Sequence, residues 1–163
     1  TLFDDKIRKS FPLGSTRRHL DSLLHALETN SPENRTSLSE ALRRSHPILK
    51  RRGMLVVVSD FLDDPAAILS SLNPYLHRHF KIHLFQILAP AELDLSGMGN
   101  STFVDAEDGR RVAANPDTIR GAYAKAMQGH MAGLRQLAVR RGVDYAVART
   151  DSHYFDLLDR LAR

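Results

Sequence analysis

The stretch MLVVVSDFLDD, residues 54–64, decides how the rest of the sequence is interpreted. Its first five residues are apolar and mostly β-branched, and the run is too short for a buried helix. This pattern predicts a central strand over residues 54–58 that is covered on both faces. Three carboxylates follow, at Asp60, Asp63 and Asp64. They indicate either a metal or phosphate site beyond the end of the strand, or the capped start of the next helix.

The composition indicates one soluble globular domain. The chain has 163 residues, of which 42% are hydrophobic and 26% charged, ordinary values for a single core. The formal net charge of +4 bears on solubility and non-specific association rather than on function. The absence of cysteine excludes disulfides and thiolate chemistry, and it fits a reducing compartment.

No part of the sequence predicts a membrane segment or a signal peptide. No apolar run approaches the roughly 18–20 residues that span a bilayer, and the first ten residues, TLFDDKIRKS, lack an apolar core. We therefore expect a cytoplasmic location for this chain. It begins at Thr1 without a methionine, and residues 1–3 resemble the end of a strand. We accordingly expect residues 1–163 to be one partial domain of a longer protein, which an upstream region would be able to tether to a membrane.

Strand and helix patterns alternate along the chain. Further strands are expected over residues 81–88 and 143–147, and a small hairpin near 102–113, where Asp-Gly favours a tight turn. Amphipathic helices are expected between the strands, beginning near Thr16, Thr36, Asp63 or Asp64, Asn115, and Asp151 or Ser152. This alternation predicts βαβ units and a mostly parallel sheet.

Several helix starts carry capping patterns. Ser37 with Glu40 three residues later matches a capping box, and Asn115 precedes Pro116 at the start of the longest helix. Asp63 and Asp64 compete as the N-cap of a helix that has Pro65 near its first position.

Asp60 is the candidate site residue. Ligands of open parallel sheets bind beyond the carboxyl ends of the strands, and a carboxylate there suits Mg²⁺, which uses one or two carboxylates and keeps several waters. Thr36 begins the preceding helix, so its hydroxyl is expected at the same edge. In the structural alternative, Asp60 accepts backbone N–H groups, and Thr36 or Ser37 caps its own helix.

Five segments of the sequence resemble the second part of the DUF58 family, bacterial proteins built around a von Willebrand factor A-like domain. The segments are LFDDKIRKSFPLGSTRRHLDSLLHAL (2–27), RTSLSEALRR (35–44), RRGMLVVVSDFLDD (51–64), LFQILAPAELDL (84–95) and RGVDYAVARTD (141–151). The resemblance implies a Rossmann-like, three-layer α/β/α domain with a metal-ion-dependent adhesion site. It assigns two elements of that site to Thr36 and Asp60.

The first element of that site, a D-x-S-x-S loop, does not occur in residues 1–163. The site is therefore expected to be incomplete. This chain should bind a divalent ion such as Mg²⁺ weakly or not at all, although the intact protein would be able to hold one. The resemblance further implies a partner, a MoxR-type AAA+ ATPase, and a role in protein assembly or maturation. We expect a protein–protein interaction domain and no enzyme.

A phosphoryl-handling domain is the alternative class. Asp4 and Asp5 after one strand and Asp60 after another imitate the acidic triad of receiver domains. However, no lysine ends the strand near 143–149, and a phosphatase would need D-x-D at a strand end, whereas Asp60 is followed by Phe-Leu-Asp.

Nucleic-acid and zinc binding are not expected. Residues 43–53 hold five Lys or Arg, but no aromatic residue is interleaved with them to stack on bases. These cations are instead expected at the solvated C-terminal end of a helix, where positive charge interacts favourably with the helix dipole. His77 and His79 are two positions apart and would point in different directions on a helix. His130 lies on the apolar stripe of the longest helix and is expected to be a satisfied core or rim histidine.

Overall fold

Three parallel strands form the main sheet of the protein. The computed structural model describes residues 1–3, 7–30, 37–49, 52–95, 101–104, 111–153 and 155–161. In this part, β3 (Met54–Ser59), β4 (Lys81–Leu88) and β7 (Asp144–Arg149) pair in the order β3-β4-β7. The strands predicted over residues 54–58, 81–88 and 143–147 are confirmed, to within one or two residues at their ends.

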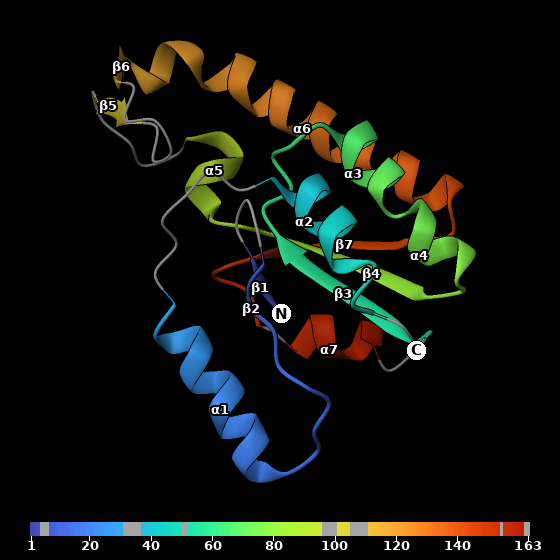
Figure 1. Cartoon of the computed structure of the whole chain (residues 1–163). Coiled ribbons are helices and arrows are strands. Elements are labelled where there is room, and N and C mark those ends of the chain that lie inside the picture. The colour runs from blue at the N-terminus through green and yellow to red at the C-terminus, as the bar shows by residue number, and fades with distance from the viewer. Residues whose placement is uncertain are drawn as a thin grey trace.

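Helices lie on both faces of this sheet (Figure 1). The helices α2 (Leu38–Ser45), α3 (Pro65–Ser71), α4 (Asn73–His77) and α6 (Pro116–Arg140) lie on one face, and α7 (Phe155–Leu161) lies on the other. The segments between consecutive parallel strands cross over the first of these faces, as expected for βαβ units. The fold is therefore a Rossmann-like mixed α/β arrangement.

The hydrophobic core lies between the sheet and the helices of the first face. Its most deeply buried large side chains come from β4, α6 and the segment that runs from α3 to α4: Ile68, Leu69, Leu72, Tyr75, Leu84 and Leu134. The burial of each such side chain contributes roughly 1.5–3 kcal/mol. The other face of the sheet is covered less completely.

The strand β3 is not covered on both faces, contrary to the expectation for residues 54–58. Met54, Val56 and Val58 are 49%, 39% and 57% exposed, whereas Val57, which points to the opposite face, is 5% exposed. The reason is the position of β3, an outer strand in the described sheet. The apolar composition of residues 54–58 predicted burial, but it did not show which elements would cover each face of the strand.

The remaining elements lie outside this core. The short strands β1 (Leu2–Phe3) and β2 (Ile7–Lys9) pair antiparallel, and so do β5 (Ser101–Val104) and β6 (Arg111–Ala114), which confirms the predicted hairpin. A short helix, α5 (Pro90–Asp94), follows β4. Figure 1 shows α1 (Arg17–Glu28) standing away from the sheet, and its leucine stripe is largely exposed. Among the described helices, none combines the length and the apolar character needed to cross a membrane.

Candidate functional site

The Asp60 loop, residues 59–64, begins where β3 ends. Asp60 is exposed, at the carboxyl edge of the parallel sheet, as predicted. Its Oδ1 accepts hydrogen bonds from the Ser59 hydroxyl, at 3.3 Å, and from the Leu62 N–H, at 3.4 Å. Both partners belong to its own turn. The carboxylate is thus oriented locally and remains open to solvent.

The residue after Asp60 has an unusual backbone conformation. Phe61 has φ +52, in the left-handed region that disfavours residues other than glycine. Its side chain is 1% exposed and belongs to the hydrophobic core, and its N–H donates to the Ser59 Oγ at 3.2 Å. The chain therefore turns sharply at Phe61, whose side chain is packed in the core. The sequence carried no signal for this, because phenylalanine is not a residue that favours a left-handed turn.

A buried glutamine holds the backbone of Asp60. The Nε2 of Gln86, on the adjacent strand β4, donates to the Asp60 carbonyl oxygen at 2.6 Å. The Gln86 side chain is fully buried, and its Oε1 accepts from the hydroxyl of Tyr145 on β7. Burial raises the pKa of Tyr145 to about 12, while Arg135 opposes the shift, so this hydroxyl is protonated at neutral pH. The three strands thus contribute one connected set of hydrogen bonds.

A histidine from α6 holds the next carbonyl. The Nε2 of His130 lies 2.7 Å from the Phe61 carbonyl oxygen. A carbonyl oxygen only accepts, so Nε2 carries the hydrogen and donates. This contact confirms that His130 is a satisfied, partly buried histidine. The sequence did not indicate that its partner would be the Asp60 loop.

The two other carboxylates of the loop cap two different helices. Asp64, one of the two predicted candidates, accepts from the N–H groups of Ala66, at 3.3 Å, and Ala67, at 3.0 Å, and so caps α3. Asp63 does not compete for that role. Its Oδ2 accepts from the N–H of Leu38, the first residue of α2, at 2.9 Å. The loop is therefore tied to α2 as well as to α3.

The predicted capping box at the start of α2 does not form. Ser37 makes no capping hydrogen bond with its side chain, and Asp63 caps this helix instead. The Glu40 carboxylate contacts Arg44 at 2.7 Å and Arg43 at 3.0 Å. These guanidinium groups, Arg44 first, hold the pKa of Glu40 below its usual value. Two cations of the basic stretch 43–53 are therefore engaged in ion pairs.

The described residues do not by themselves form a metal centre. Thr36 lies outside them, so of the two predicted ligands the structure describes Asp60 alone. No group of three His, Cys, Asp or Glu residues in the described ranges is arranged to hold a metal ion. One exposed carboxylate falls short of the ligand set that holds Mg²⁺ in proteins. The assignment of Thr36 and Asp60 as metal ligands stays a prediction.

The phosphoryl-handling alternative also depends on residues outside the described ranges, because Asp4 and Asp5 lie there. β7 ends at Arg149, where a receiver domain would need a lysine. The Arg149 guanidinium contacts the Asp151 carboxylate at 2.6 Å, and this hydrogen bond holds the pKa of Asp151 below its usual value.

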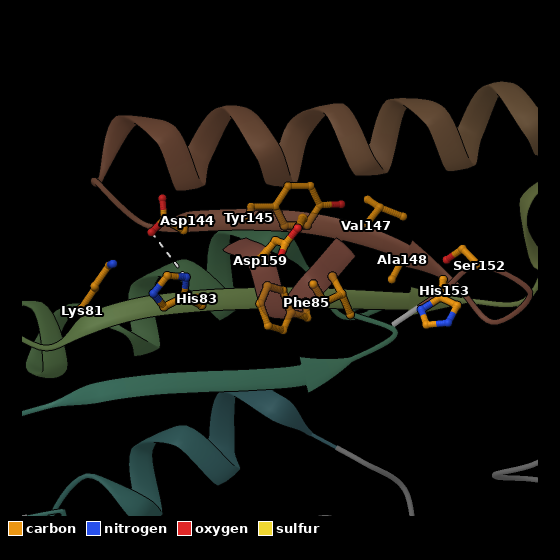
Figure 2. A pocket seen from close by; sticks show the side chains of 12 residues that line it. Lys81, His83, Phe85, Asp144, Tyr145, Val147, Ala148, Ser152, His153 and Asp159 are labelled. Carbon is orange, nitrogen blue, oxygen red and sulfur yellow. Dashed lines mark ion pairs between the residues drawn. The ribbon is translucent and has the colours of Figure 1, made fainter. Parts of the chain in front are cut away.

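A pocket of about 780 Å³ lies on the other face of the sheet, between β4, β7 and α7 (Figure 2). Its lining includes Lys81, His83, Asp144 and Asp159, but not Asp60. His83 is 1% exposed, and its Nδ1 lies 3.4 Å from the Asp144 carboxylate. Its Nε2 has no hydrogen-bond partner among the described residues. His77 and His79 are exposed and do not line this pocket.

The comparisons with known proteins point to one family. The sequence model of the family described as "Protein of unknown function DUF58" matches residues 1–133. The uncharacterized protein Rv1480 of Mycobacterium tuberculosis is 30% identical over 148 residues, which cover 86% of this chain and 45% of that protein. The uncharacterized protein MAV169 of Mycobacterium avium is 32% identical over 113 residues, 69% of this chain and 64% of that protein. No solved structure matches significantly.

Proposed function

The chain belongs to the DUF58 family of proteins of unknown function, and we propose that it is a non-catalytic domain that binds a protein partner through the Asp60 loop. The chain spans about half the length of curated relatives such as Rv1480, so the proposal concerns this domain. Its resemblance to von Willebrand factor A-like domains suggests the partner, a MoxR-type AAA+ ATPase, and a role in protein assembly or maturation.

The observation that carries the proposal is the contrast between the Asp60 carboxylate and the backbone beneath it. The carboxylate is exposed, and among the described residues it is hydrogen-bonded within its own turn alone. The backbone is held by Gln86 and His130. An exposed charge on a rigid support adds little to folding but is well suited to recognition, because little ordering remains to be done when a partner binds.

Asp60 would act as the acidic contact of the interface. A lysine or arginine of the partner would pair with it directly. In the intact protein, Asp60 and Thr36 would serve as two of the ligands of the metal-ion-dependent adhesion site that is incomplete in this chain. Mg²⁺, when bound there, would supply a positive charge for an acidic group of the partner.

The test is the affinity of the purified chain for a purified MoxR-type AAA+ ATPase, measured by biolayer interferometry with ATP and with ADP. We expect Asp60→Ala to weaken binding at least ten-fold and to change the melting temperature by less than about 2 °C, since exposed substitutions rarely affect stability by more than about 0.5 kcal/mol. Asp117→Asn is the matched control, because Asp117 is also an exposed carboxylate, in the first turn of α6.

Unchanged binding by Asp60→Ala would contradict the proposal, and so would a large loss of thermal stability with binding intact. The phosphoryl alternative is tested in parallel by incubating the chain with acetyl phosphate and Mg²⁺. A phosphoryl group detected on Asp60 by mass spectrometry would favour that alternative over a binding domain.

A further inference from the structure

We propose that Gln86 and His130 are positioning residues of the Asp60 loop. Their side chains hold two consecutive backbone carbonyls, keep Phe61 in its left-handed conformation and thereby set the direction of the Asp60 carboxylate. The consequence for binding rests on the function proposed above, whereas the consequence for loop geometry does not.

The two hydrogen bonds act on the two peptide planes that flank one Cα atom. The Asp60 carbonyl belongs to the plane before the Phe61 Cα, and the Phe61 carbonyl belongs to the plane after it. Gln86 bonds the first at 2.6 Å and His130 the second at 2.7 Å. Fixing both planes fixes φ and ψ of Phe61, because these two angles are the soft torsions between the planes. Burial of the Phe61 ring alone would hold the side chain but leave the planes free to rotate.

Both donors are themselves held in place. Gln86 lies within β4, which is paired on both sides, with β3 and with β7. The Asp60 carbonyl oxygen only accepts, so Nε2 of the amide faces it, and Oε1 accepts from the Tyr145 hydroxyl. His130 lies in the middle of α6, between Met127 and Leu134, which are both buried.

The loop needs such support because its conformation is intrinsically disfavoured. A non-glycine residue at φ +52 persists only where its surroundings determine it. Without the two donors, the backbone would relax toward an extended conformation. The Leu62 N–H that bonds Asp60 Oδ1 would move with it, and the carboxylate would lose its fixed direction.

The experiment compares four variants of the full chain. Gln86→Met keeps the size of the side chain and removes the donor. His130→Ala removes the second donor, and His130→Gln retains an N–H donor of similar reach. Tyr75→Phe is the control, because the Tyr75 hydroxyl also donates to a backbone carbonyl, that of Leu42 at 2.6 Å, but lies away from the loop.

Two measurements are made on each variant: the NMR backbone chemical shifts of residues 60–62, which distinguish left-handed from extended backbone, and the affinity for the purified MoxR-type ATPase. We expect Gln86→Met and His130→Ala to shift Phe61 away from its left-handed signature and to weaken binding about five-fold, the factor of one net hydrogen bond. His130→Gln should restore both readouts. Tyr75→Phe should lower the melting temperature and leave both unchanged.

Unchanged chemical shifts in both donor variants would overturn the positioning role. Changed shifts with wild-type affinity would overturn its link to binding. If the wild-type chain does not bind the ATPase, the proposed function fails, and the chemical shifts still decide whether Gln86 and His130 position the loop.

Discussion

The carboxylate of Asp63 accepts a hydrogen bond from the backbone N–H of Leu38, which lies 25 residues earlier in the chain and 2.9 Å away. Leu38 is the first residue of α2, and the side chain of Ser37 leaves this helix uncapped. Asp63, in the loop after β3, therefore caps the N-terminus of α2, a helix that precedes β3 in the chain. The neighbouring Asp64 caps α3 in the ordinary way.

Loss of this contact should destabilise the fold. We expect Asp63→Ala to lower the free energy of unfolding by about 1–2 kcal/mol, because a helix N–H loses its acceptor and α2 loses a favourable charge at its positive end. Chemical denaturation monitored by circular dichroism measures the change. Ser37→Ala is the matched control and should stay within about 0.5 kcal/mol. Equal losses in the two variants would mean that Ser37 shares the capping role.

Local patterns in the sequence predicted the elements of the fold well. The bounds of β4 are those expected from its apolar run over residues 81–88. Asp64 before Pro65 and Asn115 before Pro116 gave the starts of α3 and α6. These predictions succeeded because propensity, capping and periodicity depend on residues that are close in sequence.

The candidate site was predicted only in part. The sequence placed Asp60 at the end of a parallel strand, because the strand and its direction follow from local patterns. It did not predict that Gln86 and His130 hold the loop, because these partners lie 26 and 69 residues from the backbone groups they bond. The sequence left Asp63 and Asp64 as alternative caps of α3 and did not predict that Asp63 would cap α2, for the same reason. The exposed face of β3 was missed because burial depends on neighbouring elements and not on the apolar character of the strand itself.

Tyr145 should make stability depend on alkaline pH. Its pKa in the folded protein is raised from 10.0 to about 12 by burial, so the unfolded chain releases this proton first. The stabilising contribution is complete below about pH 10 and is lost as the pH rises through 12. The ring is only partly buried, so we expect a loss of about 1 kcal/mol after allowance for solvent screening.

Comparison with Tyr145→Phe isolates this effect from other groups that titrate at high pH. The variant lacks the hydrogen bond to Gln86 and should be less stable than the wild type at pH 8, by about 1 kcal/mol. Urea denaturation between pH 8 and 12 should show this difference shrinking as the pH rises. A constant difference across the range would contradict the assignment of the shift to Tyr145.

Replacement of His83 by an apolar residue should be neutral or stabilising. The side chain is 1% exposed, and its Nε2 has no hydrogen-bond partner among the described residues. Removing this unsatisfied buried atom recovers its desolvation cost, about 1 kcal/mol, which offsets the loss of the 3.4 Å contact between His83 Nδ1 and the exposed Asp144 carboxylate. We therefore expect His83→Leu to raise the melting temperature slightly or leave it unchanged, as measured by differential scanning calorimetry. A marked destabilisation would show that the imidazole has a polar role in the pocket.

Two neighbouring valines of β3 provide the sharpest test of the uncovered sheet face. Val57 and Val58 point to opposite faces, since side chains alternate along a strand, and they are 5% and 57% exposed. Threonine has nearly the shape of valine but carries a hydroxyl that needs a partner when buried. Val57→Thr should therefore cost about 1–3 kcal/mol, and Val58→Thr should stay within about 0.5 kcal/mol. Urea denaturation of both variants gives the comparison directly. Equal costs would mean that Val58 is covered in solution and that its face of β3 is part of an interface.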